Sequence, residues 1–330
     1  MKAEPVNSTA LFDAYIFVDW SASNSPTGAR PRRDAIWTGE LLPDEAAPAT
    51  HYHPTRQAAF EHVLTMLCRA SERRLRVLCG FDFPYGYPEG FARLLTPADE
   101  STSWQNVWHY LARAITDSTR NVNNRFDVAE EINQLIGHGE GPFWGHPANQ
   151  DYDFLSRFKS RFPYPTDNGS GLSEKRICER ALPRTQEAWK LFGAGSVGSQ
   201  ALVGIPRVHA LRYHPQLKDH SRVWPFETAF ESALDVETRP YILHTEIWPG
   251  VVQDRVDALM ATHNRAIKDE LQVATLCEWA HELDKGGRLA GLLAQPKNLD
   301  ARQAKRCVHE EGWVLGATSA PISRIGGQPT

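Results

Sequence analysis

The segment 75–84 constrains the fold of this chain more than any other, and its sequence is LRVLCGFDFP. It is almost entirely apolar, and Pro84 ends it. A short continuous apolar run is typical of a strand in the middle of a sheet, where both faces are buried. The segment therefore predicts the central strand of a sheet that is covered on both sides.

Three further strands and a helix are predicted before that segment. The stretch 14–23, AYIFVDWSAS, alternates as a strand does, and the stretches 34–42 and 49–55 follow it as shorter strand candidates. Thr55 is a candidate N-cap for a helix over 56–74. The order strand, strand, strand, helix, buried strand predicts an α/β fold.

The remainder of the chain divides into an insertion and a second part of the core. Residues 97–190 combine polar helices with long aromatic and glycine-rich loops, which predicts an insertion or subdomain. From 193 onward we expect a helix, two strands, a long helix over 267–287 and a last strand over 311–317. The prediction is one domain, 1–330, with its core in 12–95 and 193–317.

Composition and charge restrict the class of protein. The net charge is −4, which gives no general sign of a nucleic-acid binder. The five cysteines are scattered without a C-x-x-C pair, so neither a disulfide framework nor a zinc site is indicated. No apolar run approaches the roughly 20 residues of a membrane span, and the first residues lack the apolar core of a signal peptide. These features predict a soluble, cytoplasmic protein without a membrane partner.

A glycine-rich loop at 193–200, GAGSVGSQ, has the G-x-G-x-x-G spacing of a dinucleotide-binding turn. Such a turn follows a strand, whereas the residues before this loop, 184–192, are good helix formers. We therefore expect neither NAD nor FAD. Two interpretations remain: a tight turn between helices, or a phosphate cradle built from loop amides, Ser196 and Ser199, with Lys190 nearby.

Two aspartates stand out because each interrupts an apolar strand. Asp19 and Asp82 occur in the matching strings FVDW and GFDF. If their strands are neighbours, about 4.8 Å apart, the two carboxylates can share a divalent cation. Paired ions of this kind hydrolyse phosphodiesters in many nucleases. The alternative is that both aspartates are structural and cap turns.

Three later acids are candidates to complete this site. Glu227 and Glu246 each end a strand candidate, and the strand of Glu246 is the longer and more apolar one. Asp269 begins the helical stripe that faces the sheet. Its carboxylate is expected to point toward the strand ends. The alternative is an acid placed favourably in a first helical turn.

The chain contains the strings FVDWSAS, THYHPTR, GFDFPYGYP, NNRFDVAEEIN, GPFWGHP, FGAGSVGSQALVGIPRV, VWPFE, TEIWP, KDELQVATLCEWA and EGWVLG. Together they extend over nearly the whole chain, residues 12–317. In these strings the chain resembles a bacterial family of predicted RNase H-like nucleases, domain-of-unknown-function family 429.

The resemblance implies an RNase H-like α/β fold with a mixed sheet of strand order 3-2-1-4-5 and helices on both faces. In such folds the first and fourth strands carry the first two catalytic acids, and those positions match Asp19 and Asp82. A further acid follows the fifth strand, for which Glu227 and Glu246 compete. The last acid lies on the final helix and matches Asp269.

The combined prediction is a metal-dependent phosphodiester hydrolase, in which Asp19, Asp82 and Asp269 bind Mg²⁺ or Mn²⁺ and Glu246 is a further catalytic acid. Its expected partner is a nucleic acid or a nucleotide-containing small molecule. The residues expected to contact that substrate are Ser21, Arg56, Arg180, Lys190, Ser196, Gln200 and Glu227.

Two alternatives remain open. The first is a nucleotide or molybdopterin-nucleotide binding protein of cofactor biosynthesis, because some close relatives in the family carry labels from molybdopterin-guanine dinucleotide or cobalamin synthesis. The second is a catalytically inactive RNase H-like module. Many members of the family have a second Asp three residues after the one that matches Asp269, and this chain has Gln272 there.

Overall fold

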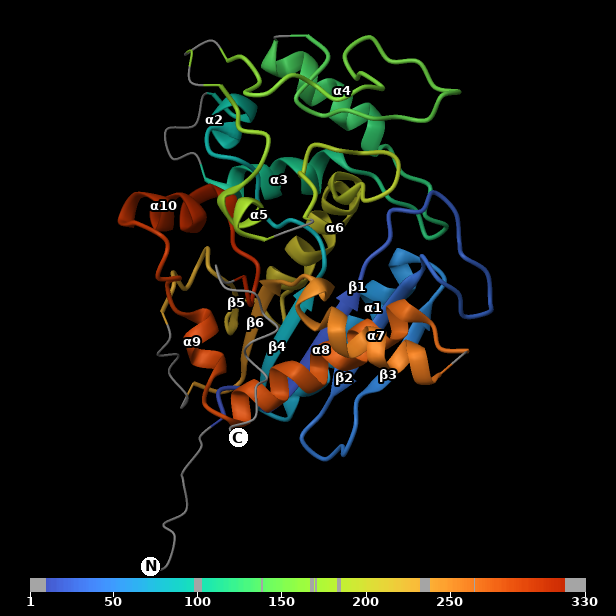
Figure 1. Cartoon of the computed structure of the whole chain (residues 1–330), viewed down its shortest axis with the longest axis vertical. Coiled ribbons are helices and arrows are strands. Elements are labelled where there is room, and N and C mark those ends of the chain that lie inside the picture. Colours follow the sequence, from blue (N-terminus) through green and yellow to red (C-terminus); the bar gives the residue numbers. More distant parts are fainter. Residues whose placement is uncertain are drawn as a thin grey trace, which may run out of the picture.

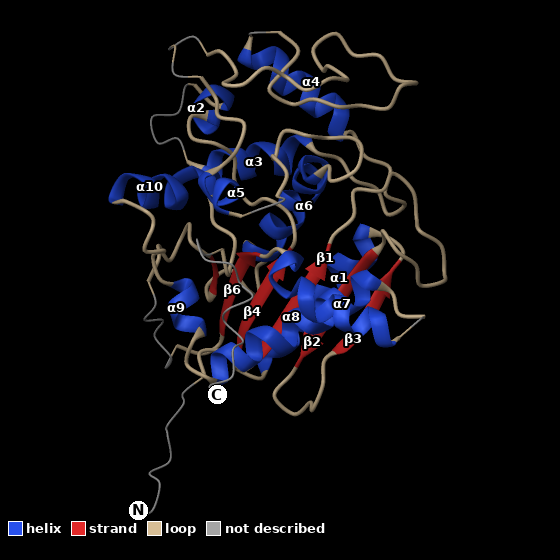
Figure 2. Cartoon of the chain, viewed as in Figure 1, coloured by secondary structure: helices blue, strands red, loops and turns tan. Residues whose placement is uncertain are grey.

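A six-stranded mixed sheet organises the protein (Figures 1 and 2). The computed structural model describes residues 10–97, 103–137, 139–166, 169, 171–182, 185–231, 238–263 and 265–317. The strands are β1 (Ala14–Asp19), β2 (Ile36–Leu41), β3 (Ala49–His53), β4 (Arg76–Phe81), β5 (Ser221–Val223) and β6 (Tyr241–Glu246). Their order is β3-β2-β1-β4-β6-β5; β1, β4, β6 and β5 are parallel neighbours, and β2 is antiparallel to β1 and β3.

The predicted α/β class is confirmed, but the predicted order 3-2-1-4-5 is wrong at its fifth place. The first four places agree. The fifth place, next to β4, belongs to β6, and β5 forms a sixth, outer strand. β6 pairs with β4 over six residue pairs, whereas the three residues of β5 pair with β6 alone. The longer and more apolar strand therefore occupies the interior of the sheet.

The two faces of the sheet carry different helices. Because side chains alternate along a strand, Ile16 and Val18 of β1 face one side, and Phe17 and Asp19 face the other. The helices α1 (Arg56–Glu72) and α6 (Val197–Arg212) cover the first face. The second face is covered by α8 (Lys268–Lys285), which contacts β1, β2 and β3 and crosses in front of them in Figure 2.

Buried apolar residues of the segment 97–190 extend the core of the first face, except Ile177, Cys178 and Leu182, which belong to the core of the second face. The described residues of this segment contain α3 (Trp104–Ala114), α4 (Arg125–Ile136) and α5 (Ile177–Ala181); α2 (Phe91–Leu95) precedes them. Trp108 of α3 is fully buried and donates a hydrogen bond from Nε1 to the carbonyl of Tyr85, beyond the end of β4. These helices therefore lie beyond the carboxyl ends of the central strands (Figure 1).

The last described part of the chain closes the second face. It contains a 3₁₀ turn (Pro249–Val252), α7 (Gln253–Thr262), α9 (Leu289–Leu293), α10 (Ala301–Arg306) and a π turn (Cys307–Glu311). The strand expected over 311–317 is reduced to one bridge between Val314 and Glu246, with the amide of Leu315 bound to the carbonyl of Glu246. No helix among the described residues is long and apolar enough to cross a membrane.

A buried histidine in β6 makes the stability of the fold sensitive to acid. His244 is fully buried, its Nε2 lies 2.8 Å from the hydroxyl of Ser221, and burial lowers its pKa to about 3. The unfolded chain takes up this proton below about pH 6.5, whereas the folded chain does not until about pH 3, so stability falls with pH in that window. We expect the stability advantage of the wild type over His244→Gln to shrink by about 2 kcal/mol between pH 7 and pH 5. Urea unfolding at both values measures it, and a constant difference would contradict the prediction.

Candidate functional site

Asp19 and Asp82 lie side by side at the carboxyl ends of two neighbouring parallel strands. The register pairs Val18 of β1 with Phe81 of β4, so the next residue of each strand is one of the two aspartates. The amide of Trp20 donates to Oδ1 of Asp82 at 2.7 Å, and the amide of Asp82 donates to the carbonyl of Val18 at 3.2 Å. The two carboxylates are therefore held next to each other by the backbone of both strands.

Asp269 brings a third carboxylate to the same end of the sheet. It lies in the first turn of α8, on the face that Asp19 points to. Its Oδ2 accepts a 2.7 Å hydrogen bond from the amide of Asp34, the residue two positions before β2. Because β2 is antiparallel to β1, this loop lies at the carboxyl end of β1 and brings a fourth acid, Asp34 itself, to the group.

We call Asp19, Asp34, Asp82 and Asp269 the aspartate group, and its electrostatics favour a bound cation. Burial, followed by repulsion from Asp82, Asp269 and Asp34, raises the pKa of Asp19 well above its ordinary value. Burial raises the pKa of Asp82 to about 7 against two backbone hydrogen bonds that lower it, and repulsion from Asp269 raises it further. Burial also raises the pKa of Asp269. A divalent cation among these oxygens would lower the pKa values of these carboxyl groups and keep them ionised.

The aspartate group is spread rather than compact. In the described part of the chain, the only three His, Cys, Asp or Glu whose ligand atoms all lie within 4.8 Å of one another are Glu40, His51 and His62. Asp19, Asp82 and Asp269 are therefore further apart than a single small ion requires. Paired ions about 3.5–4 Å apart need a ligand set that extends over a larger distance.

Neither of the two competing glutamates joins the aspartates. Glu246 is paired with Phe81 in the register, so it points to the face of the sheet opposite to Asp19. Both of its oxygens accept hydrogen bonds from Arg176, at 2.6 and 2.8 Å, and Oε2 also accepts from the amide of Tyr85.

Glu227 is likewise engaged in an ion pair. Its carboxylate accepts two 2.7 Å hydrogen bonds from Arg212 of α6 and one from the amide of Val223. Gln272, one turn after Asp269 on α8, is buried. It occupies the position at which the resemblance expects another acid, so α8 offers one carboxylate to this site where many members of that family offer two.

The glycine-rich loop is a tight turn that opens α6. Gly193 and Gly195 have φ of +92° and +72°, a region that favours glycine. A Cβ at position 198 would lie 2.3 Å from the carbonyl oxygen of Ala188, so this glycine allows close packing. The prediction of a helix over 184–192 is wrong where the chain is described, because residues 185–192 form an irregular turn with a single bridge from Lys190 to Trp144.

Of the polar side chains in and before this loop, those of Lys190 and Ser199 are bound within the protein, and that of Gln200 lies beside the residue after Asp19. Nζ of Lys190 donates to the carbonyl of Ala194 and closes the loop, while Ser199 binds Leu191 and Arg125. Ser196 begins α6 without a capping hydrogen bond from its side chain. Gln200 donates to the carbonyl of Trp20, directly after Asp19.

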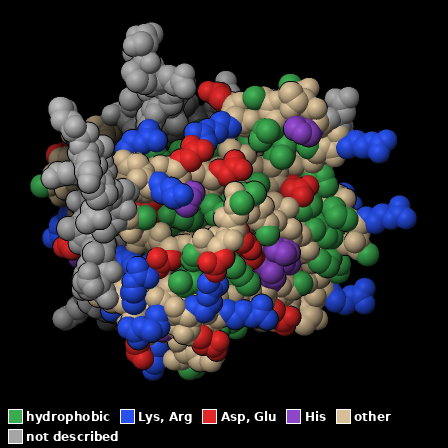
Figure 3. All heavy atoms as spheres, turned by 90° about the horizontal axis from the view of Figure 1, so that it is seen from below, with side chains coloured by type: hydrophobic (Ala, Val, Ile, Leu, Met, Phe, Trp, Pro, Cys, Tyr) green, Lys and Arg blue, Asp and Glu red, His purple; other side chains and the backbone are tan. Residues whose placement is uncertain are grey.

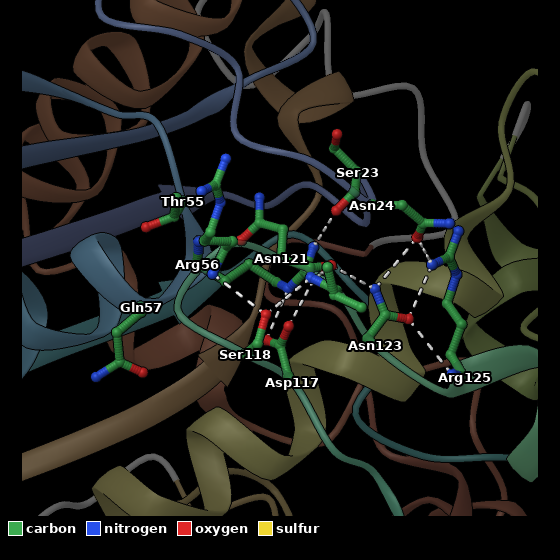
Figure 4. A network of polar contacts seen from close by, with 12 residues as sticks. Ser23, Asn24, Thr55, Arg56, Gln57, Asp117, Ser118, Asn121, Asn123 and Arg125 are labelled. Atoms are coloured by element: carbon green, nitrogen blue, oxygen red, sulfur yellow. Dashed lines mark hydrogen bonds and ion pairs between the residues drawn. The ribbon is translucent and has the colours of Figure 1, made fainter.

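The remaining predicted substrate contacts have different roles. Arg56 is fully buried; it binds both oxygens of Asp117, at 2.8 and 2.7 Å, and the carbonyl of Ser23, in the network of Figure 4. Arg180 is exposed and donates to Ser173 and to the carbonyl of Lys175. Ser21 lies near the aspartates, because its hydroxyl contacts the carbonyl of Asp34 at 3.4 Å.

Asp34 was not among the acids that the sequence singled out. Its position in the sequence could have indicated it, because an acid just before a strand that is antiparallel to β1 must lie at the carboxyl end of β1. Arg33 and Lys268 lie close enough to lower the pKa of Asp269, so both are cations at the rim of the group.

Comparison with known proteins adds no relative to this picture. No family model, no curated protein and no solved structure matches the chain.

Proposed function

We propose that the protein is a metal-dependent phosphodiester hydrolase of the RNase H-like type, with Asp19, Asp82 and Asp269 as its metal ligands. The observation that carries the proposal is the meeting of these acids, from β1, β4 and α8, at one end of the sheet with raised pKa values. The neighbourhood β3-β2-β1-β4, with β1 and β4 parallel, supports the RNase H-like interpretation.

The donor set suits a hard cation. Carboxylate oxygens are the ligands that Mg²⁺ and Mn²⁺ prefer. When bound, such ions polarise a phosphoryl oxygen and make a bound water acidic enough to act as nucleophile. The chain itself fixes the ligands: the amide of Trp20 holds the carboxylate of Asp82, and the amide of Asp34 holds that of Asp269.

Groups for the substrate surround the aspartates. Arg33 and Lys268 supply positive charge at the rim for a phosphate, and Ser21 and Gln200 lie beside the end of β1. A net charge of −4 favours a nucleotide-containing small molecule or a short nucleic acid over a long duplex, because binding a duplex needs many basic contacts. On the opposite side of the molecule, drawn in Figure 3, Lys and Arg side chains are interspersed with Asp and Glu side chains.

A second candidate is a nucleotide-binding protein that does not hydrolyse its ligand. Two observations favour it: Gln272 replaces a possible carboxylate, and Glu246 is bound by Arg176 on the opposite face. A protein of this kind would be stabilised by a nucleotide with Mg²⁺ but would release no product over time.

The direct test of the first proposal is Mn²⁺ binding followed by electron paramagnetic resonance. We expect Asp19→Asn to abolish Mn²⁺ binding and to lower hydrolysis of bis(p-nitrophenyl) phosphate by at least about 1,000-fold, since it removes one of the three proposed carboxylate ligands. Asp44→Asn is the matched control, because Asp44 is an exposed partner of Arg73. Equal Mn²⁺ affinity in the wild type and in Asp19→Asn would overturn the metal site. Binding without turnover would favour the second candidate.

A further inference from the structure

Glu40, His51 and His62 form a second group of metal-ligating side chains, which we call the edge cluster. Their ligand atoms all lie within 4.8 Å of one another. Glu40 is in β2, His51 is in the edge strand β3, and His62 is in α1. The sequence itself shows two histidines in the third predicted strand, His51 and His53, but no pattern in it links them to Glu40 or His62.

The edge cluster lies on the face of the sheet opposite to the aspartates. Glu40 is paired with Ile16 of β1 in the register, so both point to the face that α1 covers, whereas Asp19 points to α8. The edge cluster is therefore separate from the site proposed above, and its function does not depend on that proposal.

The local sequence explains how the three residues meet. β3 ends at His53, and Thr55 caps α1 by accepting a hydrogen bond from the amide of Ala58. The chain thus turns directly from the edge strand into a helix that lies over the same face. Val63 of α1 is buried against the sheet. Its neighbour His62 lies at the edge of this buried helix face, and its Nε2 contacts Oε1 of Glu40.

The distances fit a small ion held between three ligands. Nε2 of His62 contacts Oε1 of Glu40, and Nε2 of His51 lies 3.8 Å from Oε2 of Glu40, too far for a direct hydrogen bond. The imidazole centroids of His51 and His62 are 4.6 Å apart. In a tetrahedral zinc site, nitrogen and oxygen ligands about 2.1 Å from the ion lie about 3.4 Å from each other. Small side-chain shifts would therefore complete the site.

The charge of Glu40 also calls for a cation. Its side chain is only 5 % exposed, and among the described residues its ion-pair partners are His51 and His62. A buried carboxylate without a permanent cation beside it is costly. A divalent ion shared with two neutral imidazoles would compensate this charge at neutral pH.

Access and ligand type indicate which ion fits. The side chain of His51 is 43 % exposed and that of His62 27 %, so an ion can enter from solvent and keep water as its fourth ligand. Two imidazoles and one carboxylate suit Zn²⁺ and its neighbours, whereas Mg²⁺ prefers oxygen ligands alone. His53 lies on the same strand face: its Nε2 is 3.0 Å from the hydroxyl of Thr38, and its ring centroid is 4.9 Å from that of His62.

We propose that Glu40, His51 and His62 bind one Zn²⁺ ion, which joins the edge strand β3 to β2 and α1. The first consequence is that Zn²⁺ holds three elements together and raises the melting temperature. The second is selectivity: Zn²⁺, and Co²⁺ as its spectroscopic substitute, bind here, and Mg²⁺ does not.

The test uses the full chain after removal of metals with a chelator. We expect one equivalent of Zn²⁺ to bind at the edge cluster and Co²⁺ to give the intense visible absorption of a four-coordinate site. The melting temperature of Asp19→Asn, which lacks the aspartate site, should rise with Zn²⁺ but not with Mg²⁺. His51→Ala should weaken Zn²⁺ binding at least about 100-fold, since even residues behind a metal ligand change affinity 10–100-fold. His51 is half exposed, so this variant keeps the fold even if Glu40→Gln does not.

Two controls make the result decisive. His263→Ala removes an exposed histidine at the end of α7 and should leave Zn²⁺ binding unchanged. Asp19→Asn should also leave it unchanged, which separates this site from the aspartate group. Equal Zn²⁺ affinity in the wild type and in His51→Ala would overturn the proposal, as would the absence of Zn²⁺ binding to the wild type.

Discussion

Replacing Arg176 by Met should lower the free energy of unfolding by about 3–5 kcal/mol, because it leaves buried carboxylates without a counter-charge. The guanidinium donates from Nε to Glu179 at 2.7 Å and from both terminal nitrogens to Glu246. All three side chains are almost completely buried. Nη1 also donates to the carbonyl of Glu311, so one arginine connects α5, β6 and the π turn Cys307–Glu311.

Urea unfolding of Arg176→Met measures this loss. Arg255→Met is the matched control, because the pair of Arg255 with Glu282 is exposed, and its loss should cost about 0–1 kcal/mol. Adding Glu246→Gln to Arg176→Met should recover part of the stability, since it removes one of the stranded charges. A double variant less stable than Arg176→Met would contradict the electrostatic explanation.

Replacing Arg56 by Met should also lower the free energy of unfolding by about 3–5 kcal/mol, and it should weaken Mn²⁺ binding at the aspartate site. Arg56 is fully buried and binds Asp117 through two nitrogens, and it holds the carbonyls of Ser21 and Ser23 at 3.1 and 2.7 Å. These carbonyls belong to the loop that leaves β1 directly after Asp19. We expect this loop to lose its fixed position and Mn²⁺ affinity to fall although every aspartate remains.

The control for this effect shares the same carboxylate. Arg207 also binds Asp117, at 3.0 Å, but its side chain is partly exposed, and it does not hold the loop after β1. Arg207→Met should therefore cost about 1 kcal/mol and leave Mn²⁺ affinity unchanged. Unfolding curves and Mn²⁺ titrations of both variants test this, and equal effects of the two substitutions would show that the loop is held by other contacts.

The elements that position the aspartates were predictable because their signals are local. The apolar run before Asp82 and the alternation around Asp19 indicate strands without reference to any partner. The apolar stripe along α8 likewise predicts that Asp269 lies on the face of the helix that packs against the sheet.

What could not be predicted depends on pairing between distant segments. Glu246 ends its strand as expected, but the register places it beside Phe81 instead of Asp82, and one residue decides which face a side chain takes. Its partner Arg176 lies 70 positions away, directly before the short helix α5, and no sequence pattern links the two residues. The residues before the glycine loop have high helix propensity, yet packing of Ala188 and Lys190 against Gly198 gives a turn.

The place of β6 in the sheet has a consequence for synthesis on the ribosome. β4 is made early, but its neighbour on one side is β6, and Tyr85 and Glu246, which meet there, are separated by 161 positions. At a synthesis rate of about 5–20 residues per second, the hydrogen-bonding edge of β4 waits about 8–30 s for its partner. The amide of Leu315 binds the carbonyl of Glu246, so the end of β6 is covered only after these later residues have also emerged. During that interval the nascent chain exposes an apolar strand edge, the kind of surface that aggregates and that chaperones bind.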